Sequence, residues 1–216
     1  SYTVLFVDLD RFKIVNDSLG HITGDELLKW VAARMQACLQ PPNTAIRMGG
    51  DEFVVLLETG EATAVARQLL EQLSLPFNFN DYEVVIGASI GITSSAIGYK
   101  NPMDALRDAD IAMYRAKQEK KGGYQIFTPQ MQASALARMQ MEHNLRKGIA
   151  AEEFSLHYQP ILSLTTKELK GFEALLRWNH PNGMIPPGKF IPLAEETGLI
   201  NPLGWWIVRE ACSQLQ

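Results

Sequence analysis

Two acidic residues directly follow two glycines in the segment RMGGDEFVVLLE, residues 47–58. Asp51 and Glu52 stand at the start of an apolar run, and Asp8 stands near the end of an earlier one, TVLFVDLD. Carboxylates that lie close together repel each other and raise each other's pKa unless a positive group lies between them. A hard divalent cation such as Mg²⁺ takes oxygen ligands of this kind and keeps phosphate or water in the rest of its shell. These residues therefore predict a Mg²⁺ site, provided that the fold brings the two strand ends together.

The neighbouring residues are suited to a phosphate ligand. The two glycines lack side chains, so the backbone there can approach a phosphate closely. The positive charge that a triphosphate requires is available from four basic residues, Lys13, Arg47, Lys117 and Lys121. A simpler interpretation is a hairpin turn with solvated acidic residues. That interpretation does not account for Asp8 and Asp10 at the facing strand end, or for Asn16 and Asp25 nearby.

The elements that must position these residues follow from the apolar pattern. Short apolar runs predict buried strands, and apolar residues three and four positions apart predict helices. Residues 11–24 read as a polar stretch. Asn101 is expected to cap the helix that begins at that residue. The expected strands are 3–10, 44–48, 52–58, 82–95 and 122–127, and the expected helices are 25–39, 61–73 and 101–120.

This order of elements predicts an α+β fold that contains a split βαβ unit. In such a unit the first two strands are parallel, and the third lies between them, antiparallel to both. The end of strand 3–10 should then lie beside the start of strand 52–58. Asp8, Asp51 and Glu52 are therefore expected to meet at one edge of one sheet.

Composition limits the class of protein. The chain has 216 residues, 46% of them hydrophobic, and a net charge of −4, so a packed core is expected and broad nucleic-acid binding is not. No apolar run reaches the length of a membrane span. Cys38 and Cys212 are expected to be reduced thiols, which fits a cytoplasmic location, with membrane anchoring of a longer parent protein left open. Because the chain begins almost directly in a strand, we expect that a preceding segment has been removed.

Three parts are expected along the chain. Residues 1–128 form a first domain, residues 129–150 a helical connector, and residues 151–216 the beginning of a second domain. The second domain should open with strands and continue with helices, and Trp205 and Trp206 are expected to belong to the core of a complete domain and to be uncovered in this part of it. The expected strands are 154–164 and 169–178, and the expected helices are 188–199 and 204–214.

Three separated motifs in the first domain resemble a known family. RMGGDEF (47–53), DLDRFKIVNDSLGHITGDELL (8–28) and DADIAMYRAK (108–117) are similar to the GGDEF domain of diguanylate cyclases, over roughly residues 2–127. The resemblance implies a palm-like fold, in which an antiparallel sheet has flanking helices as in nucleotidyl cyclases. It also implies that two GTP molecules condense to cyclic di-GMP with release of pyrophosphate. Because each domain would hold one GTP, it implies a homodimer for turnover.

The same resemblance assigns the metal and the catalytic groups. Asp8 and Asp51 would hold Mg²⁺ (or Mn²⁺) with the help of the backbone carbonyl of Leu9, and Glu52 would lie in the same site. Catalytic roles fall to Asp51, Glu52 and Lys13, of which Lys13 would hold the phosphates.

Substrate binding is assigned by position in the same way. Asn16 and Asp25 would read the guanine edge, because an amide and a carboxylate together match its acceptor and donors. The remaining contacts to the triphosphate would come from Gly49, Gly50, Lys117 and Lys121.

The sequence departs from the family pattern in three places. The segment that normally precedes the first strand is missing, which puts independent stability in doubt. The Arg-x-x-Asp motif of product inhibition is replaced by residues 40–43, Gln-Pro-Pro-Asn. The Gly-Arg-Asn that follows the last motif is replaced by Lys120-Lys121-Gly122, and lysine keeps the charge of arginine but loses its bidentate geometry.

The chain from about Glu142 resembles the start of an EAL domain, a cyclic di-GMP phosphodiesterase. The similar segments are YQPI (158–161), EALLRW (173–178) and FIPLAEETGLI (190–200). The resemblance implies that Glu173 binds a divalent metal, that Gln159 lies near it, and that Arg177 contacts a phosphate of the dinucleotide. An α/β barrel of this kind takes about 250 residues, and only 75 remain from residue 142 to residue 216, so an incomplete barrel is expected.

Three functions are compatible with these resemblances. The first is a diguanylate cyclase joined to a truncated phosphodiesterase, which the intact GGDEF segment and Asp8 favour. The second is a GTP-binding regulatory domain that controls the phosphodiesterase without cyclising GTP, which the altered residues 120–122 leave open. The third is a cyclic di-GMP receptor, which the loss of Arg-x-x-Asp disfavours. A sensory domain is expected upstream in the parent protein.

Overall fold

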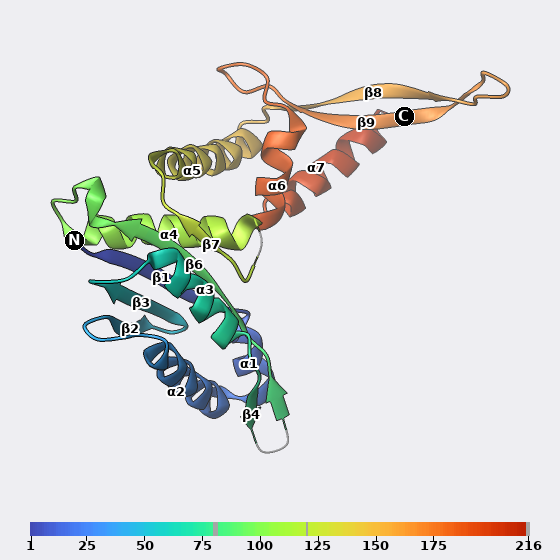
Figure 1. Ribbon diagram of the computed structural model, residues 1–216. Helices are drawn as coiled ribbons and strands as arrows, with labels where there is room; N and C mark the ends of the chain where they lie inside the picture. The colour runs from blue at the N-terminus through green and yellow to red at the C-terminus, as the bar shows by residue number, and fades with distance from the viewer. Residues whose placement is uncertain (80–81, 120, 215–216) are drawn as a thin grey trace. The chain divides into compact units, whose positions relative to one another are not determined.

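The computed structural model describes residues 1–79, 82–119 and 121–214 and divides into two compact units (Figure 1). The units are Ser1–Ser134 and Ala135–Gln216, and each has a hydrophobic core of its own. Within the described residues, no helix has the length and apolar character needed to cross a membrane.

The first unit is built on a five-stranded sheet with the order β2-β3-β1-β6-β7. The central strand β1 (Thr3–Asp10) runs antiparallel to β3 (Glu52–Leu57) and to β6 (Gly87–Ser94). At the edges, β2 (Thr44–Gly49) is antiparallel to β3, and β7 (Tyr124–Ile126) is parallel to β6. The predicted split βαβ unit is therefore confirmed, because β3 lies between β1 and β2 and is antiparallel to both.

Helices cover both faces of this sheet because its strands are apolar on both sides. Leu5, Val7 and Leu9 of β1 pack in the larger core with α2 (His21–Ala37) and α3 (Ala62–Leu73). The alternate residues Val4 and Phe6 pack with α4 (Pro102–Glu119) on the opposite face. A short 3₁₀ helix, η1 (Ser95–Ile97), follows β6. As predicted, Asn101 caps α4, because its Oδ1 accepts the N–H of Met103 at 3.0 Å.

The first unit departs from the prediction after β1 and between residues 77 and 97. The polar stretch after β1 contains a helix, α1 (Phe12–Leu19), whose Phe12, Val15 and Leu19 pack against the larger core. The predicted strand 82–95 is two strands, because β5 (Tyr82–Val84) pairs with β4 (Phe77–Phe79), whereas β6 pairs with β1. The chain leaves one sheet and enters another at that point, although its apolar pattern continues.

The second unit contains the predicted strand pair and helices. β8 (Phe154–Leu162) and β9 (Leu169–Trp178) form an antiparallel two-stranded sheet, followed by α6 (Pro187–Glu196) and α7 (Ile200–Ser213). The predicted connector is one helix, α5 (Pro129–Ala150), which crosses the division between the units.

The core of the second unit is aromatic. Phe154, Trp178 and Phe190 pack with ring centroids 5.4–5.8 Å apart, and Trp206 packs against them. Trp205 is 74% exposed and Trp206 is half-buried, and both stay predicted as core residues of a complete barrel.

Candidate nucleotide and metal site

The acidic residues meet at one edge of the sheet of the first unit. In the β1–β3 ladder Asp8 lies directly opposite Glu52. The backbone N–H of Leu9 donates a hydrogen bond to the carbonyl of Asp51, with 3.2 Å between nitrogen and oxygen. This is the arrangement that the split βαβ topology predicts, and it is produced by two segments more than forty positions apart in the sequence.

Asp8 is a buried carboxylate whose counterion is Lys117. Lys117 Nζ lies 2.6 Å from Asp8 Oδ1, and the Asp8 side chain is 11% exposed. Burial raises the pKa of Asp8, the hydrogen bond and charge of Lys117 oppose this rise, and the nearby Asp51 and Glu52 add to it, so that the pKa lies above its ordinary value of 3.8. Lys117 was expected to bind a phosphate, and Asp8 was expected to bind a metal. In the structure the two side chains bind each other.

The donor set suits a hard divalent cation. The carboxylates of Asp51 and Glu52 act electrostatically on Asp8, and among the described residues Lys117 brings the positive charge that acts on it. In residues 1–79, 82–119 and 121–214, no three His, Cys, Asp or Glu side chains are grouped closely enough to hold a metal ion as they stand. Binding would therefore require these side chains to turn toward one point, and the oxygen chemistry of the set fits Mg²⁺.

The glycine turn is open to solvent. Gly49 ends β2 and pairs with Glu52, so the turn itself consists of Gly50 and Asp51. The two-glycine sequence suits a hairpin turn with positive φ angles, and of the two glycines only Gly50 has a left-handed backbone, with φ of 51°. A Cβ added at either glycine would meet no atom within 4 Å. Arg47 stabilises the turn, because its Nε donates a hydrogen bond to the carbonyl of Gly50 at 3.0 Å.

Asp10 has a structural role. Its carboxylate accepts hydrogen bonds from Ser89 Oγ and from the backbone N–H of Gly122, both at 3.0 Å. It thereby ties the end of β1 to β6 and to the segment that carries Lys121. Lys120 lies outside the described residues.

The residues expected to bind guanine lie around the corner between α1 and α2. Asn16 is half-buried on α1, and Asp25 is exposed on α2. The corner is made at Gly20, which has φ of 83°. Lys13 on α1 and Lys121 after α4 are exposed, and neither forms an ion pair within the part of the chain that the structure describes. The structure therefore brings Asp8, Asp51 and Glu52 together at the sheet edge. Where the chain is described, Lys13 and Lys121 form no ion pair with these carboxylates.

Asn43, at the site of the missing product-inhibition motif, is buried. Its Oδ1 accepts the backbone N–H groups of Glu58 and Thr59 at 2.9 and 3.2 Å. Asn43 therefore caps the end of β3 and is not available to a ligand. The sequence offered no signal for this contact, which joins residues on both ends of a hairpin.

In the second unit, two of the three expected residues face each other. Gln159 lies opposite Glu173 in the β8–β9 ladder, and both are exposed. Arg177 lies further along β9, where its Nη1 donates to the carbonyl of Leu176 at 2.9 Å.

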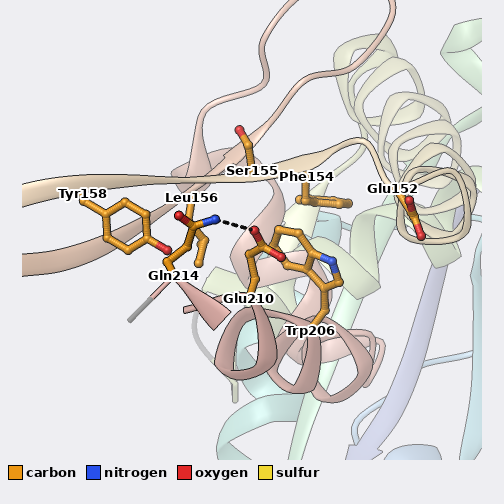
Figure 2. Close-up of a pocket in the computed structure, with 8 residues that line it drawn as sticks. All are labelled: Glu152, Phe154, Ser155, Leu156, Tyr158, Trp206, Glu210 and Gln214. Carbon is orange, nitrogen blue, oxygen red and sulfur yellow. Dashed lines mark hydrogen bonds between the residues drawn. The ribbon is translucent and has the colours of Figure 1, made fainter. Parts of the chain in front are cut away.

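A hollow of about 450 Å³ lies between β8 and α7, lined by Tyr158, Trp206, Glu210 and neighbouring residues (Figure 2). The amide of Gln214 donates to Glu210 there at 3.5 Å. None of Gln159, Glu173 and Arg177 lines it.

Comparison with known proteins agrees with both resemblances. Residues 1–123 match the family described as diguanylate cyclase, GGDEF domain, and residues 142–216 match the EAL domain. The bifunctional diguanylate cyclase/cyclic di-GMP phosphodiesterase MucR of Pseudomonas aeruginosa is 43% identical over 100% of this chain, and the cyclic di-GMP phosphodiesterase PdeR of Escherichia coli is 39% identical over 98%. The chain spans 32% of the length of each of these two relatives.

Solved structures give the same assignment for the first unit. An EAL/GGDEF domain protein from M. capsulatus is 41% identical, with a TM-score of 0.57 over 59% of this chain and 85% of that one. Four of the five strands of the sheet, its flanking helices and the GGDEF turn lie within residues 1–123, and β7 follows directly at Tyr124. The chain belongs to the GGDEF family of diguanylate cyclase domains, followed here by part of an EAL domain.

Proposed function

We propose that the first unit binds GTP and condenses two molecules of it to cyclic di-GMP, in tandem with an EAL phosphodiesterase domain. The observation that carries the proposal is the position of Asp8 opposite Glu52, beside Asp51 and the open turn at Gly50. Family membership supports cyclic di-GMP turnover in general, and the carboxylate cluster supports the cyclase reaction in particular.

The residues of the chain divide the work of the reaction. A bound Mg²⁺ would lower the pKa of the attacking 3′-hydroxyl and stabilise the departing pyrophosphate. Asp8, Asp51, Glu52 and the carbonyl of Leu9 would hold it. Lys117 would turn from Asp8 to the phosphates, because the cation replaces it as the partner of that carboxylate.

The rest of the nucleotide would be held by α1, α2 and the segment after α4. Lys13 and Lys121 would neutralise the triphosphate where it passes over Gly49 and Gly50. Asn16 and Asp25 would hydrogen-bond to the guanine edge. Since one unit holds one GTP, two units would face each other, and we expect specific activity to rise with protein concentration.

The test is incubation of the purified 216-residue chain with GTP and Mg²⁺, with the product identified by mass spectrometry. Cyclic di-GMP that forms with Mg²⁺, and fails to form when EDTA is added, supports the proposal. ATP in place of GTP is the matched control and should give no product. Absence of GTP binding by calorimetry would overturn the proposal.

A second candidate is a GTP-binding unit that regulates the phosphodiesterase without cyclising GTP. Two observations favour it: PdeR, at 39% identity, is named only as a phosphodiesterase, and Lys121-Gly122 stands where the family has Arg-Asn. In this case GTP binds without product, and it changes the rate at which a longer protein with a complete EAL domain hydrolyses cyclic di-GMP.

The chain spans 32% of the length of MucR and of PdeR, which supports a place within a longer protein. We propose that residues 1–128 act as the cyclase domain, 129–150 as the connector and 151–216 as the start of the phosphodiesterase domain. A cytoplasmic location and an upstream sensory domain are part of this proposal.

A further inference from the structure

Gly24 stands in the first turns of α2, where glycine is not required by the backbone. Its φ lies outside the left-handed region, and glycine is a poorer helix former than alanine. A different feature of its surroundings must therefore account for glycine at this position.

The Asn16 side chain occupies the space that a Gly24 side chain would take. A Cβ built on Gly24 would lie 1.9 Å from Asn16 Oδ1, 3.0 Å from Asn16 Cγ and 3.3 Å from Phe12 Cζ. The first of these distances is far shorter than any real contact to a Cβ. The amide of Asn16 thus rests directly on the backbone of α2.

The corner between the two helices fixes this contact. The N–H of Gly20 donates to the carbonyl of Asn16 at 3.0 Å, and the N–H of Gly24 donates to the carbonyl of Gly20 at 3.2 Å. Asp25 follows Gly24 directly in the chain. The close approach at Gly24 therefore holds the amide of Asn16 beside the helix position that carries Asp25.

We infer that Gly24 is a positioning residue for guanine recognition, which acts by holding the Asn16 amide in place. The inference rests on the proposed function, because the guanine contacts of Asn16 and Asp25 belong to it. Within the described part of the chain, no group hydrogen-bonds to the Asn16 side-chain amide. The amide is thus placed by packing, with its oxygen against the backbone at Gly24, and its N–H donors stay available to a base.

The substitution Gly24→Ala should separate positioning from folding. The atom that obstructs the new methyl group is the end of a flexible side chain, so Asn16 can rotate away while the helix stays intact. We expect Tm to stay within about 4 °C of the original value or to rise, because alanine favours the helix. We expect the Kd for guanine nucleotide to rise about tenfold, the factor for one lost hydrogen bond.

The experiment measures the binding of a GTP analogue with an α,β-methylene bridge by calorimetry, in the presence of Mg²⁺. The variants are Gly24→Ala, Asn16→Ala and the double variant. Gly204→Ala is the matched control, since Gly204 lies in α7 and a Cβ there meets no atom within 4 Å. Support consists of weaker binding in Gly24→Ala with no further loss when it is added to Asn16→Ala.

Three results would overturn the inference: unchanged affinity in Gly24→Ala, full additivity of the two substitutions, or loss of the fold in Gly24→Ala. Failure of the proposed function is recognised separately. If the original chain binds no GTP analogue, the guanine site is wrong, and the side-chain amide resonances of Asn16 in NMR spectra still report on its placement. Resonances that do not shift between the original chain and Gly24→Ala would overturn the positioning role by themselves.

Discussion

At the scale of single residues, the carboxylates of the site differ in their burial and therefore in how much they need a positively charged partner. Asp8 is buried and paired with Lys117, whereas Asp51 and Glu52 are half-buried at the turn. A buried carboxylate is costly unless a positive group accompanies it. The site therefore favours a positive charge next to Asp8, and Lys117 provides it in this structure.

Asp51→Asn is expected to abolish cyclisation and to leave the fold intact. The substitution removes a charge that would act on the metal and the transition state, and keeps the side-chain size, so a loss of at least about 10²–10³ in rate is expected. Cyclic di-GMP production measures the first effect and circular dichroism the second. Glu71→Gln, an exposed change of the same charge on α3, is the control. Product formation at the original rate in Asp51→Asn would remove Asp51 from the mechanism.

Lys117→Gln is expected to raise the pKa of Asp8 further. In the original chain burial already raises this pKa, and the hydrogen bond and charge of Lys117 oppose the rise. Removal of Lys117 leaves burial, Asp51 and Glu52, which all act in the same direction, so Asp8 should keep its proton to a higher pH. Carboxyl ¹³C chemical shifts, followed over pH 3–8, measure this.

Lys29→Gln on α2 serves as the control for this titration because Lys29 takes no part in the interactions that shift Asp8. A pKa of Asp8 that falls or stays constant in Lys117→Gln would show that the ion pair has no influence on the carboxylate.

At the scale of elements, α4 is fastened to the sheet by a polar network. Tyr99 Oη donates to Asp108 Oδ2 at 2.9 Å and lies 2.7 Å from Thr93 Oγ1 on β6, and Arg107 Nε donates to Asp108 Oδ1 at 2.9 Å. Asp108 is 3% exposed. The network therefore joins β6 and the segment before α4 to the first half of α4, and Lys117 lies in the last turn of the same helix.

Tyr99→Phe is expected to lower the free energy of unfolding by about 1–3 kcal/mol, because it deprives a buried carboxylate of a donor. Burial, with Asp108 nearby, raises the pKa of Tyr99 from 10.0 to about 12. The protonated phenol thus stabilises the folded state fully below pH 10, and this contribution is lost as pH rises toward 12. Urea unfolding between pH 8 and 12 should show the loss in the original chain and a flatter profile in Tyr99→Phe.

The control for this series is Tyr114→Phe, since Tyr114 is exposed on the same helix. An alkaline profile that is the same in Tyr99→Phe and in the original chain would mean that another group controls stability in this range.

Asn43→Ala is expected to destabilise the first unit by about 1–3 kcal/mol, since two backbone N–H groups at the end of β3 lose their acceptor. Gln40→Arg with Asn43→Asp, which restores the family motif, keeps an acceptor at this position and should unfold near the original midpoint. Urea unfolding of the two variants measures both effects. Equal stability of Asn43→Ala and the original chain would contradict the capping role.

Sequence reasoning succeeded where one local pattern determines one element. The apolar runs gave β1 and β3, Asn101 gave the start of α4, and the split βαβ rule placed Asp8 opposite Glu52. It failed where neither a local pattern nor this topological rule determines the outcome. The break between β5 and β6 follows from a change of partner strand. The helix α1 was missed although Phe12, Val15 and Leu19 stand at helical spacing, because the polar residues between them were read as a loop.

The same distinction holds for the site. The residue types that gather at the sheet edge could be predicted, because topology alone brings them there. The pairing of Lys117 with Asp8, the capping by Asn43 and the contact of Gly24 with Asn16 could not, because each depends on the direction that a side chain takes after folding.

At the scale of the whole molecule, the two units differ in how many expected site residues lie together. The first unit matches the GGDEF family over residues 1–123 and brings Asp8, Asp51 and Glu52 to one sheet edge, whereas the second unit matches the EAL domain over residues 142–216 with β8, β9, α6 and α7. In the second unit the polar residues expected near a metal are Gln159 and Glu173, opposite each other on an exposed part of the hairpin.

The 216-residue chain is therefore expected not to hydrolyse cyclic di-GMP, with either Mg²⁺ or Mn²⁺. A hydrolytic metal site needs about three protein ligands and a positioned water, and within residues 135–214 no three His, Cys, Asp or Glu side chains are grouped for such a site. Arg177 supplies a single phosphate contact, with part of its guanidinium bound to the carbonyl of Leu176. Chromatography of cyclic di-GMP after incubation with the chain measures the linear dinucleotide, and a longer relative with a complete EAL domain is the positive control. Steady production of the linear dinucleotide that disappears in Glu173→Ala would show that residues 135–214 already form a complete hydrolytic site. The second unit would then be a phosphodiesterase in its own right.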